Sequence, residues 1–277
     1  MTPPMYGTVE QIERLGASMI RVVFGGPGLD SFAATDRTDQ YVNALFVPEA
    51  ATYSAPFEPA EVSSLDADLR PRGRRYTVRR WDETSRLLTI DFVAHGDAGY
   101  AGRWARRARR GDTLQMVGPS GGYRPDPESD WYLMTGDESA LPAIAASLEV
   151  VPAGSHCAVR VVVDGPDSEI ELPGPGTLDV KWLHRRTAAE PDTLLADAVA
   201  SLSWRPGTVD VFVHGEASEV RAVRRYLLEH RGVDRERASI SPYWRRDHTD
   251  EAWRATKREW LAAQDADTPV SDRAPAG

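Results

Sequence analysis

The pattern of the chain changes at residues 124–130, which read RPDPESD. This segment is rich in proline and polar residues, as connections between domains are. Before it, short runs of alternating apolar and polar residues predict antiparallel strands; in the run at 87–95, Leu88, Ile90 and Phe92 share one face. After it, apolar runs alternate with helical stretches, which predicts a parallel sheet with right-handed crossovers.

Both halves can be divided into elements. We expect an antiparallel β-barrel domain at 1–126 and an α/β domain at 127–264 that ends in a helix with Trp253 and Trp260 on one face. The polar residues 265–277 are expected to be a disordered tail. The expected strands are 19–24, 40–47, 75–81, 87–95, 113–117, 131–135, 157–163, 178–184, 209–214 and 238–241, and the expected helices are 101–110, 140–150, 193–202, 219–231 and 250–263.

Composition limits the kind of site that this chain can build. Cys157 is the single cysteine, so no disulfide within the chain and no cysteine-ligated iron–sulfur cluster or zinc site is possible. We expect Cys157 to be a small apolar residue at the start of a strand. Redox chemistry would therefore need a bound organic cofactor or a metal that arrives with the substrate, and we expect no metal site of the protein's own.

Charge and hydropathy exclude other classes. The net charge of −9 argues against a nucleic-acid partner. No run approaches the roughly 18–20 apolar residues of a transmembrane helix, and residues 1–5 show no signal-peptide pattern. We therefore expect a cytoplasmic protein without stable membrane insertion. We also expect a monomer, a property that the sequence does not determine. Of the 33 basic residues only Lys181 and Lys257 are lysines and the other 31 are arginines, so an arginine cluster is weak evidence of a site here.

The first motif is RRYTVR at residues 74–79, on an expected barrel strand. Strand alternation directs Arg74, Tyr76 and Val78 to one side, and Arg75 and Thr77 to the other. A bound flavin needs a phosphate partner, an aromatic surface against its ring and a hydrogen bond near N5, and Arg, Tyr and Thr side chains supply these. The alternative is a strand with ordinary cross-strand pairs.

The second motif is HGDAGYAGRW at residues 95–104, where a strand ends, a glycine-rich turn follows and a helix begins. Free backbone N–H groups at a helix start attract a diphosphate. The alternative is a turn in which glycine serves only the backbone. The helix that follows carries five arginines, which we interpret as a solvated face rather than a nucleic-acid or targeting surface.

Four further motifs lie where elements end. Residues 118–123, GPSGGY, are either a hairpin turn or the exit of the chain from the barrel beside a cofactor. Residues 135–144, TGDESALPAI, and 213–217, VHGEA, each join a strand to a helix at the end of the sheet where nucleotides bind; Asp137 and Glu138 could equally complement a helix dipole. Residues 241–246, SPYWRR, place Tyr243 and Trp244 either over a flavin ring or in the core against the last helix.

Taken in order, these motifs resemble those of the siderophore-interacting protein family of flavin-dependent ferric-siderophore reductases, over residues 5–262. The family's R-x-Y-T-x-R is here Arg74 to Arg79, and its D-F-V-x-H-G is Asp91 to Gly96. Its G-D-E-T-A-L-P-A-I is Gly136 to Ile144, with serine at 139. Its A-G-E-A corresponds to residues 214–217, and its G-Y-W-R to 242–245. Each motif is short, but five in the correct order form a specific pattern.

The resemblance implies a ferredoxin-reductase-like fold, with an FAD-binding barrel and an NAD(P)H-binding α/β domain. It also implies site residues. The expected cofactor-binding residues are Arg74, Tyr76, Thr77, Val78, Asp91, Val93, His95, Gly96, Ala98, Gly99, Tyr100, Ala101, Asp137, Ser139, Ala140, Tyr243 and Trp244. The candidate substrate-binding residues, basic and suited to an anionic chelate, are Arg185, Arg186, Arg245, Arg246 and Lys257.

The implied activity is the reduction of ferric siderophores by FAD, with release of Fe²⁺ in the cytoplasm. NADPH, NADH or a reduced ferredoxin would supply the electrons, and the flavin would pass them to iron one at a time. The alternatives are a general NAD(P)H:flavin reductase of another acceptor and a flavin-holding protein that binds iron chelates without efficient turnover. Three residues depart from the family pattern: Tyr100 replaces proline, Pro242 replaces glycine, and Asn43 replaces lysine.

Overall fold

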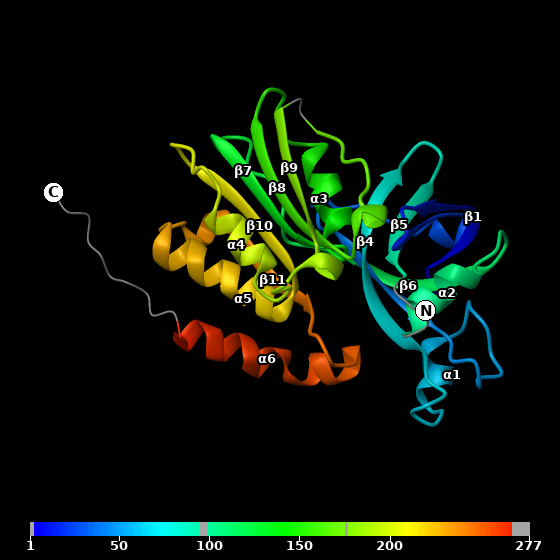
Figure 1. Ribbon diagram of the computed structural model, residues 1–277. Coiled ribbons are helices and arrows are strands. Elements are labelled where there is room, and N and C mark those ends of the chain that lie inside the picture. The colour runs from blue at the N-terminus through cyan, green and yellow to red at the C-terminus, as the bar shows by residue number, and fades with distance from the viewer. Residues whose placement is uncertain (1–2, 95–98, 175–176, 268–277) are drawn as a thin grey trace.

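The computed structural model describes residues 3–94, 99–174 and 177–267. Its first part is a closed antiparallel barrel with the strand order β1-β2-β5-β4-β3-β6 (Figure 1). The short helix α1 (Pro59–Ser63) follows β3, and α2 (Tyr100–Arg107) lies between β5 and β6. The barrel strands are β1 (Tyr6–Leu15), β2 (Met19–Gly25), β3 (Tyr41–Phe46), β4 (Arg72–Asp82), β5 (Leu87–Val93) and β6 (Thr113–Ser120).

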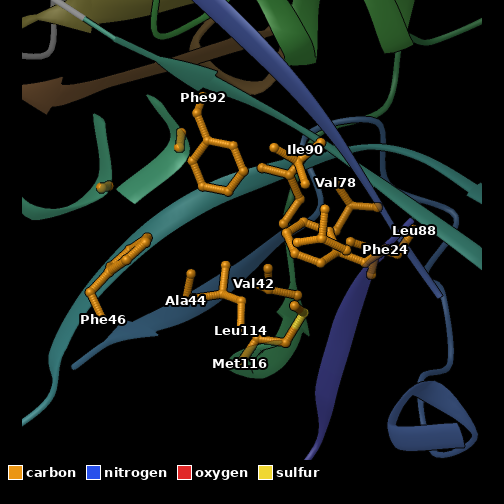
Figure 2. Packing of buried hydrophobic residues seen from close by; sticks show 14 of the residues in the cluster. Phe24, Val42, Ala44, Phe46, Val78, Leu88, Ile90, Phe92, Leu114 and Met116 are labelled. Carbon is orange, nitrogen blue, oxygen red and sulfur yellow. The ribbon is translucent and has the colours of Figure 1, made fainter. Parts of the chain in front are cut away.

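Aromatic and branched side chains fill the barrel. Figure 2 shows Phe24, Ile90 and Phe92 among the side chains that strand alternation directs inward. The ring of Tyr76 on β4 lies 4.5 Å from that of Phe92, centroid to centroid, and Trp104 of α2 stacks on Phe24 at 6.1 Å. Strand β4 therefore lies against the barrel core through one face, and its other residues remain available at the barrel surface.

The second part is a five-stranded parallel sheet with the order β11-β10-β7-β8-β9. Helix α3 packs on one face of the sheet, and helices α4 and α5 on the other. Apolar residues on both faces explain why the strand sequences are almost continuously hydrophobic. The elements are β7 (Trp131–Asp137), α3 (Leu141–Leu148), β8 (His156–Val163), β9 (Thr177–His184), α4 (Leu194–Ala200), β10 (Val209–Glu216), α5 (Ala217–Arg225), a π-helical turn (Tyr226–His230) and β11 (Ala238–Trp244).

The chain order of the sheet places its switch point between β7 and β10. The first strand, β7, has β8 on one side and β10 on the other, so the crossovers leave β7 in opposite directions. Ligands of open α/β sheets bind in the crevice at the carboxyl ends of the strands at this point. Residues 135–137 and 214–216 lie there side by side, since His214 is in register with Gly136.

The last helix, α6 (Asp250–Asp267), joins the two parts of the molecule. Arg254 donates from Nη2 to the Gly73 carbonyl of β4 at 3.0 Å, and Lys257 donates from Nζ to the Pro242 carbonyl of β11 at 2.6 Å. Trp253, only 2% exposed, lies edge-on to Trp260. In Figure 1 the orange end of α6 reaches the barrel while the rest of the helix extends beneath α5.

The predicted barrel and parallel sheet are confirmed, with element ends shifted by a few residues. The strand β1 and the helix α1 were not predicted. In β1 only Gly7 and Val9 are buried and residues 11–14 are exposed, so the apolar alternation that indicates a strand is missing, and the strand is held by pairing with β2 and β6. No helix in the described ranges is both long and apolar enough to cross a membrane.

The boundary predicted at 126/127 lies between β6 and β7, and the division into domains at that residue stays a prediction. The disordered tail was expected to begin at residue 265, which is too early because α6 continues to Asp267. Residues 268–277 lie outside the described residues, so disorder there stays a prediction. At the connection, Tyr123 Oη donates to Asp210 Oδ1 at 2.5 Å, and the Asp126 N–H donates to Asp210 Oδ2 at 3.0 Å. These contacts tie the connecting segment to β10.

Candidate functional site

A cavity of about 590 Å³ lies between the barrel and the parallel sheet. Pockets for small ligands and cofactors are typically ~300–1,000 Å³. Three parts of the chain wall it: β3, β4 and β5 of the barrel, the carboxyl ends of β7, β10 and β11, and the first turns of α6. The cavity thus lies at the switch point of the sheet, and both domains contribute to it.

The barrel wall is built by β4. Arg74, Arg75, Tyr76 and Thr77 all line the cavity. Burial raises the pKa of Tyr76, which stays a neutral phenol, and the Arg75 guanidinium lies 5.4 Å from the ring centre of Tyr41. The strand therefore presents cationic, aromatic and hydroxyl groups to the cavity within four consecutive residues.

The guanidinium of Arg74 is held by acidic residues of α6. Its Nη1 lies 3.3 Å from Asp250 Oδ2, and its Nη2 lies 2.9 Å from Glu251 Oε1. Arg74 is 16% exposed, whereas Glu251 is 48% exposed. The Arg74 side chain also lies over the ring of Tyr100 at 5.7 Å. An anion in the cavity would compete with these two carboxylates for the same guanidinium.

The residues around Tyr100 fit the phosphates of a dinucleotide. Gly99, immediately before α2, has φ +85° and no heavy atom within 4 Å of the place where a Cβ would stand. Arg72 also lies over Tyr100, at 5.9 Å, and its buried Nε has no hydrogen-bond partner in the described chain. Open backbone, an orphaned cationic donor and Arg74 form a suitable set of donors for phosphate oxygens. His95, Gly96 and Ala98, which were also predicted to bind the cofactor, lie outside the described residues.

Asp91 on β5 lines the cavity but is already paired. Its carboxylate accepts two hydrogen bonds from Arg21 of β2, at 2.7 and 2.8 Å. Asp91 is 2% exposed, and a bidentate pair of this kind holds both side chains rigidly. Asp91 therefore ties β5 to its neighbour β2.

At the switch point, the carboxylate of Asp137 joins three strand ends. Its Oδ1 accepts from the N–H and the hydroxyl of Ser139, at 2.8 and 2.5 Å. Its Oδ2 accepts from the Glu216 N–H at 2.8 Å and from Trp244 Nε1 at 2.7 Å. Burial and the nearby Glu138 raise the pKa of Asp137. This side chain thus links the turns after β7, β10 and β11.

Two glycines allow these strand ends to approach each other. A Cβ on Gly136 would stand 2.1 Å from the carbonyl oxygen of His214. Gly215 has φ +143°, and a Cβ there would stand 2.7 Å from Asp137 Oδ2. Glycine is therefore required at both positions for the hydrogen bonds of Asp137 to form.

More carboxylates surround Asp137. Glu138, 3% exposed, is bound by Arg185 at 2.9 Å. Glu216 caps α5, since its side chain accepts from the N–H groups of Ser218 and Glu219. Glu219 is buried with neither carboxylate oxygen hydrogen-bonded in the described chain, and burial together with Asp137 raises its pKa to about 8. Acidic groups therefore cluster at these strand ends, where Asp137 and Glu138 line the cavity.

The third wall combines β11 and α6. Tyr243 and Trp244 line the cavity, together with Trp253, Arg254 and Lys257. Burial and the nearby Arg75 lower the pKa of Lys257. Within the described residues, the cavity-lining cations Lys257 and Arg75 form no ion pair with a carboxylate, and they lie near enough to repel each other. An anionic ligand between them would relieve that repulsion.

The structure brings together only part of the predicted site. The predicted residues that line the cavity are Arg74, Tyr76, Thr77, Asp91, Val93, Asp137, Ser139, Tyr243, Trp244 and Lys257. Those packed in the hydrophobic cores are Val78, Ala101 and Ala140, with Tyr100 against the barrel core. Those outside the lining are Arg185, paired with Glu138, Arg186, paired with Asp167, Arg246, paired with Asp192, and Arg245.

Several lining residues were not predicted. Asp39 accepts from the N–H groups of Gly122 and Tyr123, at 2.9 and 2.8 Å, and so ties the 118–123 segment to the cavity wall. His214 is a polar residue at the end of a run of apolar strand residues, which is a signal that the sequence does contain. Among the described residues, no group of three or more histidine, cysteine or acidic side chains is arranged to hold a metal ion.

Comparison with known proteins identifies the family. Residues 8–123 match the siderophore-interacting FAD-binding domain, and residues 129–247 match the siderophore-interacting protein family. The chain belongs to the siderophore-interacting protein family. The barrel is therefore the FAD-binding domain of this family.

Three relatives show how far the likeness extends. An uncharacterized protein of Mycobacterium tuberculosis is 42% identical over 90% of this chain and 93% of its own length. The ferric vibriobactin reductase ViuB of Vibrio cholerae is 32% identical over 85% of this chain and 87% of its own. The NADPH-dependent ferric-chelate reductase of Escherichia coli is 28% identical over 86% of this chain and 91% of its own.

Solved structures agree with this placement. The siderophore-interacting protein SipS from Aeromonas hydrophila superposes with a TM-score of 0.80 at 26% identity, over 94% of this chain and 98% of SipS. A ferredoxin reductase of carbazole 1,9a-dioxygenase shares the fold, with a TM-score of 0.62 at 15% identity over 87% of this chain and 69% of that one. The predicted ferredoxin-reductase-like architecture is confirmed.

Proposed function

We propose that this siderophore-interacting protein reduces ferric siderophores, with FAD as its redox cofactor and a reduced nicotinamide as its electron donor. The observation that carries the proposal is the cavity at the switch point of the sheet, which the R-x-Y-T residues of β4 wall on the opposite side. Two relatives over most of the chain bear the names of ferric reductases. The family's FAD-binding domain and the place of the cavity thus support the same proposal.

Residues of the barrel wall would hold the cofactor. Arg74 supplies a charged donor for phosphate, Gly99 leaves its backbone open, and Thr77 supplies a hydroxyl beside the aromatic ring of Tyr76. When bound, FAD supplies the ability to accept two electrons from a nicotinamide and to donate them singly. The protein's task is to orient that cofactor between its two domains.

The cations near α6 would hold the substrate. Siderophores bind Fe³⁺ through hard, often anionic oxygen ligands, which hold Fe²⁺ far less tightly. One electron therefore releases the metal, and the protein need not supply iron ligands. Lys257 and Arg75 are placed to attract an anionic chelate into the cavity. A substrate role for Arg185 or Arg246 would require their ion pairs with Glu138 and Asp192 to open.

The donor is proposed to be NADPH or NADH, bound at the carboxyl ends of β7 and β10. The parallel sheet and its switch point support a nicotinamide site, and the relative from Escherichia coli is named for NADPH. A reduced ferredoxin is the other donor to test. Because reduced nicotinamides are generated in the cytoplasm, we propose the reaction for that compartment, carried out by a monomer.

Absorption spectroscopy and stopped-flow kinetics test the proposal. We expect the purified protein to bind FAD without a covalent bond, to lose its flavin absorbance under anaerobic NADPH or NADH, and to regain it on mixing with a ferric siderophore. Fe²⁺ should appear in a ferrous-specific chelator with the same time course. Light scattering should give the mass of one chain.

Other outcomes would overturn the proposal. Re-oxidation by a quinone or by oxygen, without acceleration by any ferric chelate, would indicate a general flavin reductase. Tight binding of ferric chelates without electron transfer would indicate a binding protein. Failure to take up FAD would exclude both flavin functions, and reduction by ferredoxin alone would replace the donor.

A further inference from the structure

A patch of polar side chains lies on the cavity-facing side of β10 and β11. His214 of β10 is in register with Ser241 of the parallel strand β11. Strand alternation puts Ser239, Ser241 and Tyr243 on one side of β11, and His214, Ser239, Ser241 and Tyr243 all line the cavity. We call His214, Ser239 and Ser241 the histidine–serine patch.

The ring of His214 is held in one orientation. It stacks on Phe212 at 4.0 Å with an interplanar angle of 23°, and the ring of Tyr243 lies 4.7 Å away on the cavity wall. Nε2 lies 2.9 Å from Ser239 Oγ. His214 is 4% exposed, and Phe212, Tyr243 and Ser239 together hold its ring in a single orientation.

The imidazole is neutral and has one nitrogen left over. Burial and the nearby Lys257 ammonium lower the pKa of His214 to about 3. Nε2 has the Ser239 hydroxyl as its partner, and we assign the ring proton to this nitrogen. Nδ1 is then an acceptor, and it has no hydrogen-bond partner in the described chain.

These features define the ligand group that would fit. The acceptor Nδ1 calls for an N–H donor, and the Ser241 hydroxyl on the next strand can donate to a carbonyl oxygen. A primary carboxamide carries both groups on one carbon. The Lys257 ammonium, held on the Pro242 carbonyl of the same strand, favours a neutral ring over a cationic one. A dihydronicotinamide is such a ring with such a carboxamide.

We propose that His214 and Ser241 form the subsite that binds the carboxamide of the reduced nicotinamide donor. This inference rests on the proposed function, since it names the residues that receive the donor. The subsite would orient the ring at the junction of the two domains, and Lys257 would favour departure of the ring once it has become cationic. His214 acts as a fixed hydrogen-bond acceptor and does not transfer a proton.

The test compares two donors on matched variants. NADPH carries the carboxamide, and its 3-acetylpyridine analogue keeps the carbonyl but lacks the N–H donor. His214→Phe keeps the stacked ring and removes the nitrogen, Ser241→Ala removes the hydroxyl, and His230→Phe makes the same change at an exposed position outside the cavity. Anaerobic stopped-flow measures flavin reduction by each donor.

We expect wild type and His230→Phe to prefer NADPH over the analogue by ~10-fold, the size of one hydrogen bond. His214→Phe should lose that preference by slowing with NADPH only, and Ser241→Ala should slow with both donors. Two further measurements should stay unchanged in both variants: the Kd for FAD, and the rate at which dithionite-reduced protein is re-oxidised by a ferric chelate.

The outcomes separate this inference from the proposed function. A His214→Phe variant that still discriminates between the donors would overturn the subsite while leaving the proposed reaction intact. An equal loss of FAD affinity would mean that the N–H donor belongs to the flavin, which also overturns the subsite. A third outcome is that no nicotinamide reduces the wild-type flavin, although the dithionite-reduced protein still reduces ferric chelates. That result would overturn both the subsite and the proposal that a nicotinamide is the electron donor.

Discussion

The two domains wall the cavity with opposite chemistry. On the barrel side, β4 presents cations and aromatic rings, and the carboxylates that pair with Arg74 come from α6 and are partly exposed. On the sheet side, Asp137, Glu138 and Glu219 are buried among the strand ends. Exposed ion pairs can be exchanged at little cost, whereas buried polar groups cannot. The barrel wall is therefore suited to binding anions, and the sheet wall to fixing its own shape.

The largest loss of stability is expected where the sheet wall is held together. Asp137→Ala removes the acceptor of four hydrogen bonds and leaves the Glu216 N–H and the Trp244 indole N–H without their partner. We expect a loss of about 3 kcal/mol in the free energy of unfolding, measured by urea denaturation. The control is Asp36→Ala, at a side chain that is 69% exposed. This substitution should change the free energy of unfolding by less than about 0.5 kcal/mol. Equal effects of the two variants would show that the hydrogen bonds of Asp137 do not stabilise the sheet wall.

Next in size is the loss of the barrel wall's phosphate partner. Arg74→Ala should weaken FAD binding by about 2 kcal/mol, roughly 30-fold in Kd, as the loss of a charge-assisted hydrogen bond does. Titration of apoprotein followed by flavin fluorescence measures this. Arg80→Ala, an exposed arginine of the same strand, is the matched control. An unchanged Kd in Arg74→Ala would move phosphate binding away from β4.

A third prediction concerns the buried acid Glu219. Its folded-state pKa is raised to about 8 from an ordinary 4.5, so between these values the folded protein holds a proton that the unfolded chain has released. Stability should therefore fall as pH rises through this window, at up to about 1.4 kcal/mol per pH unit. Glu219→Gln removes that loss, and we expect the variant to exceed wild type by about 4 kcal/mol at pH 8 and to match it near pH 4.

Urea denaturation at several pH values checks the Glu219 prediction. The control is Glu236→Gln, an exposed glutamate, for which the difference from wild type should not change with pH. A pH-independent difference for Glu219→Gln would mean that the carboxylate is ionised in the folded protein, with Arg246 at 3.8 Å as its partner.

The smallest effect is expected at the ion pair between Arg74 and Glu251. Glu251→Gln removes one competitor for the Arg74 guanidinium, and because Glu251 is half exposed we expect FAD to bind only about 2–5-fold more tightly. The gain should shrink as salt is added. In an Arg74→Ala background the substitution should have no effect, which a double-mutant cycle measures. A gain that persists without Arg74 would separate Glu251 from the phosphate site.

Local periodicity was sufficient to predict most of the fold, because buried strands and amphipathic helices repeat on characteristic periods. It also led to the turns at Gly136 and Gly215, where strand ends meet. Strand β1 escaped prediction because its exposed half is mostly polar, and its place depends partly on β6, which is distant in sequence. The positions that align with family motifs mostly line the cavity, whereas three of the basic residues chosen by charge, Arg185, Arg186 and Arg246, are bound by carboxylates.

Pairing between distant charges could not be predicted. The contact of Arg74 with Asp250 and Glu251 joins residues about two-thirds of the chain apart, and no pattern along the sequence specifies which of many carboxylates an arginine will meet. The same holds for the tie between Arg21 and Asp91. His214 differs, because a histidine closing an apolar strand is visible in the sequence; only its unsatisfied nitrogen required the structure.

The position of α6 has a consequence for biosynthesis. This helix supplies one wall of the cavity, through Asp250, Trp253 and Lys257, yet it follows every strand of both domains in the chain. A ribosome that has released residue 249 has already produced the complete barrel and the complete sheet, and the pocket between them still lacks a side. The nascent protein therefore offers an open cleft to a cofactor as large as FAD, and the helix that encloses it is translated after the other walls of the cavity.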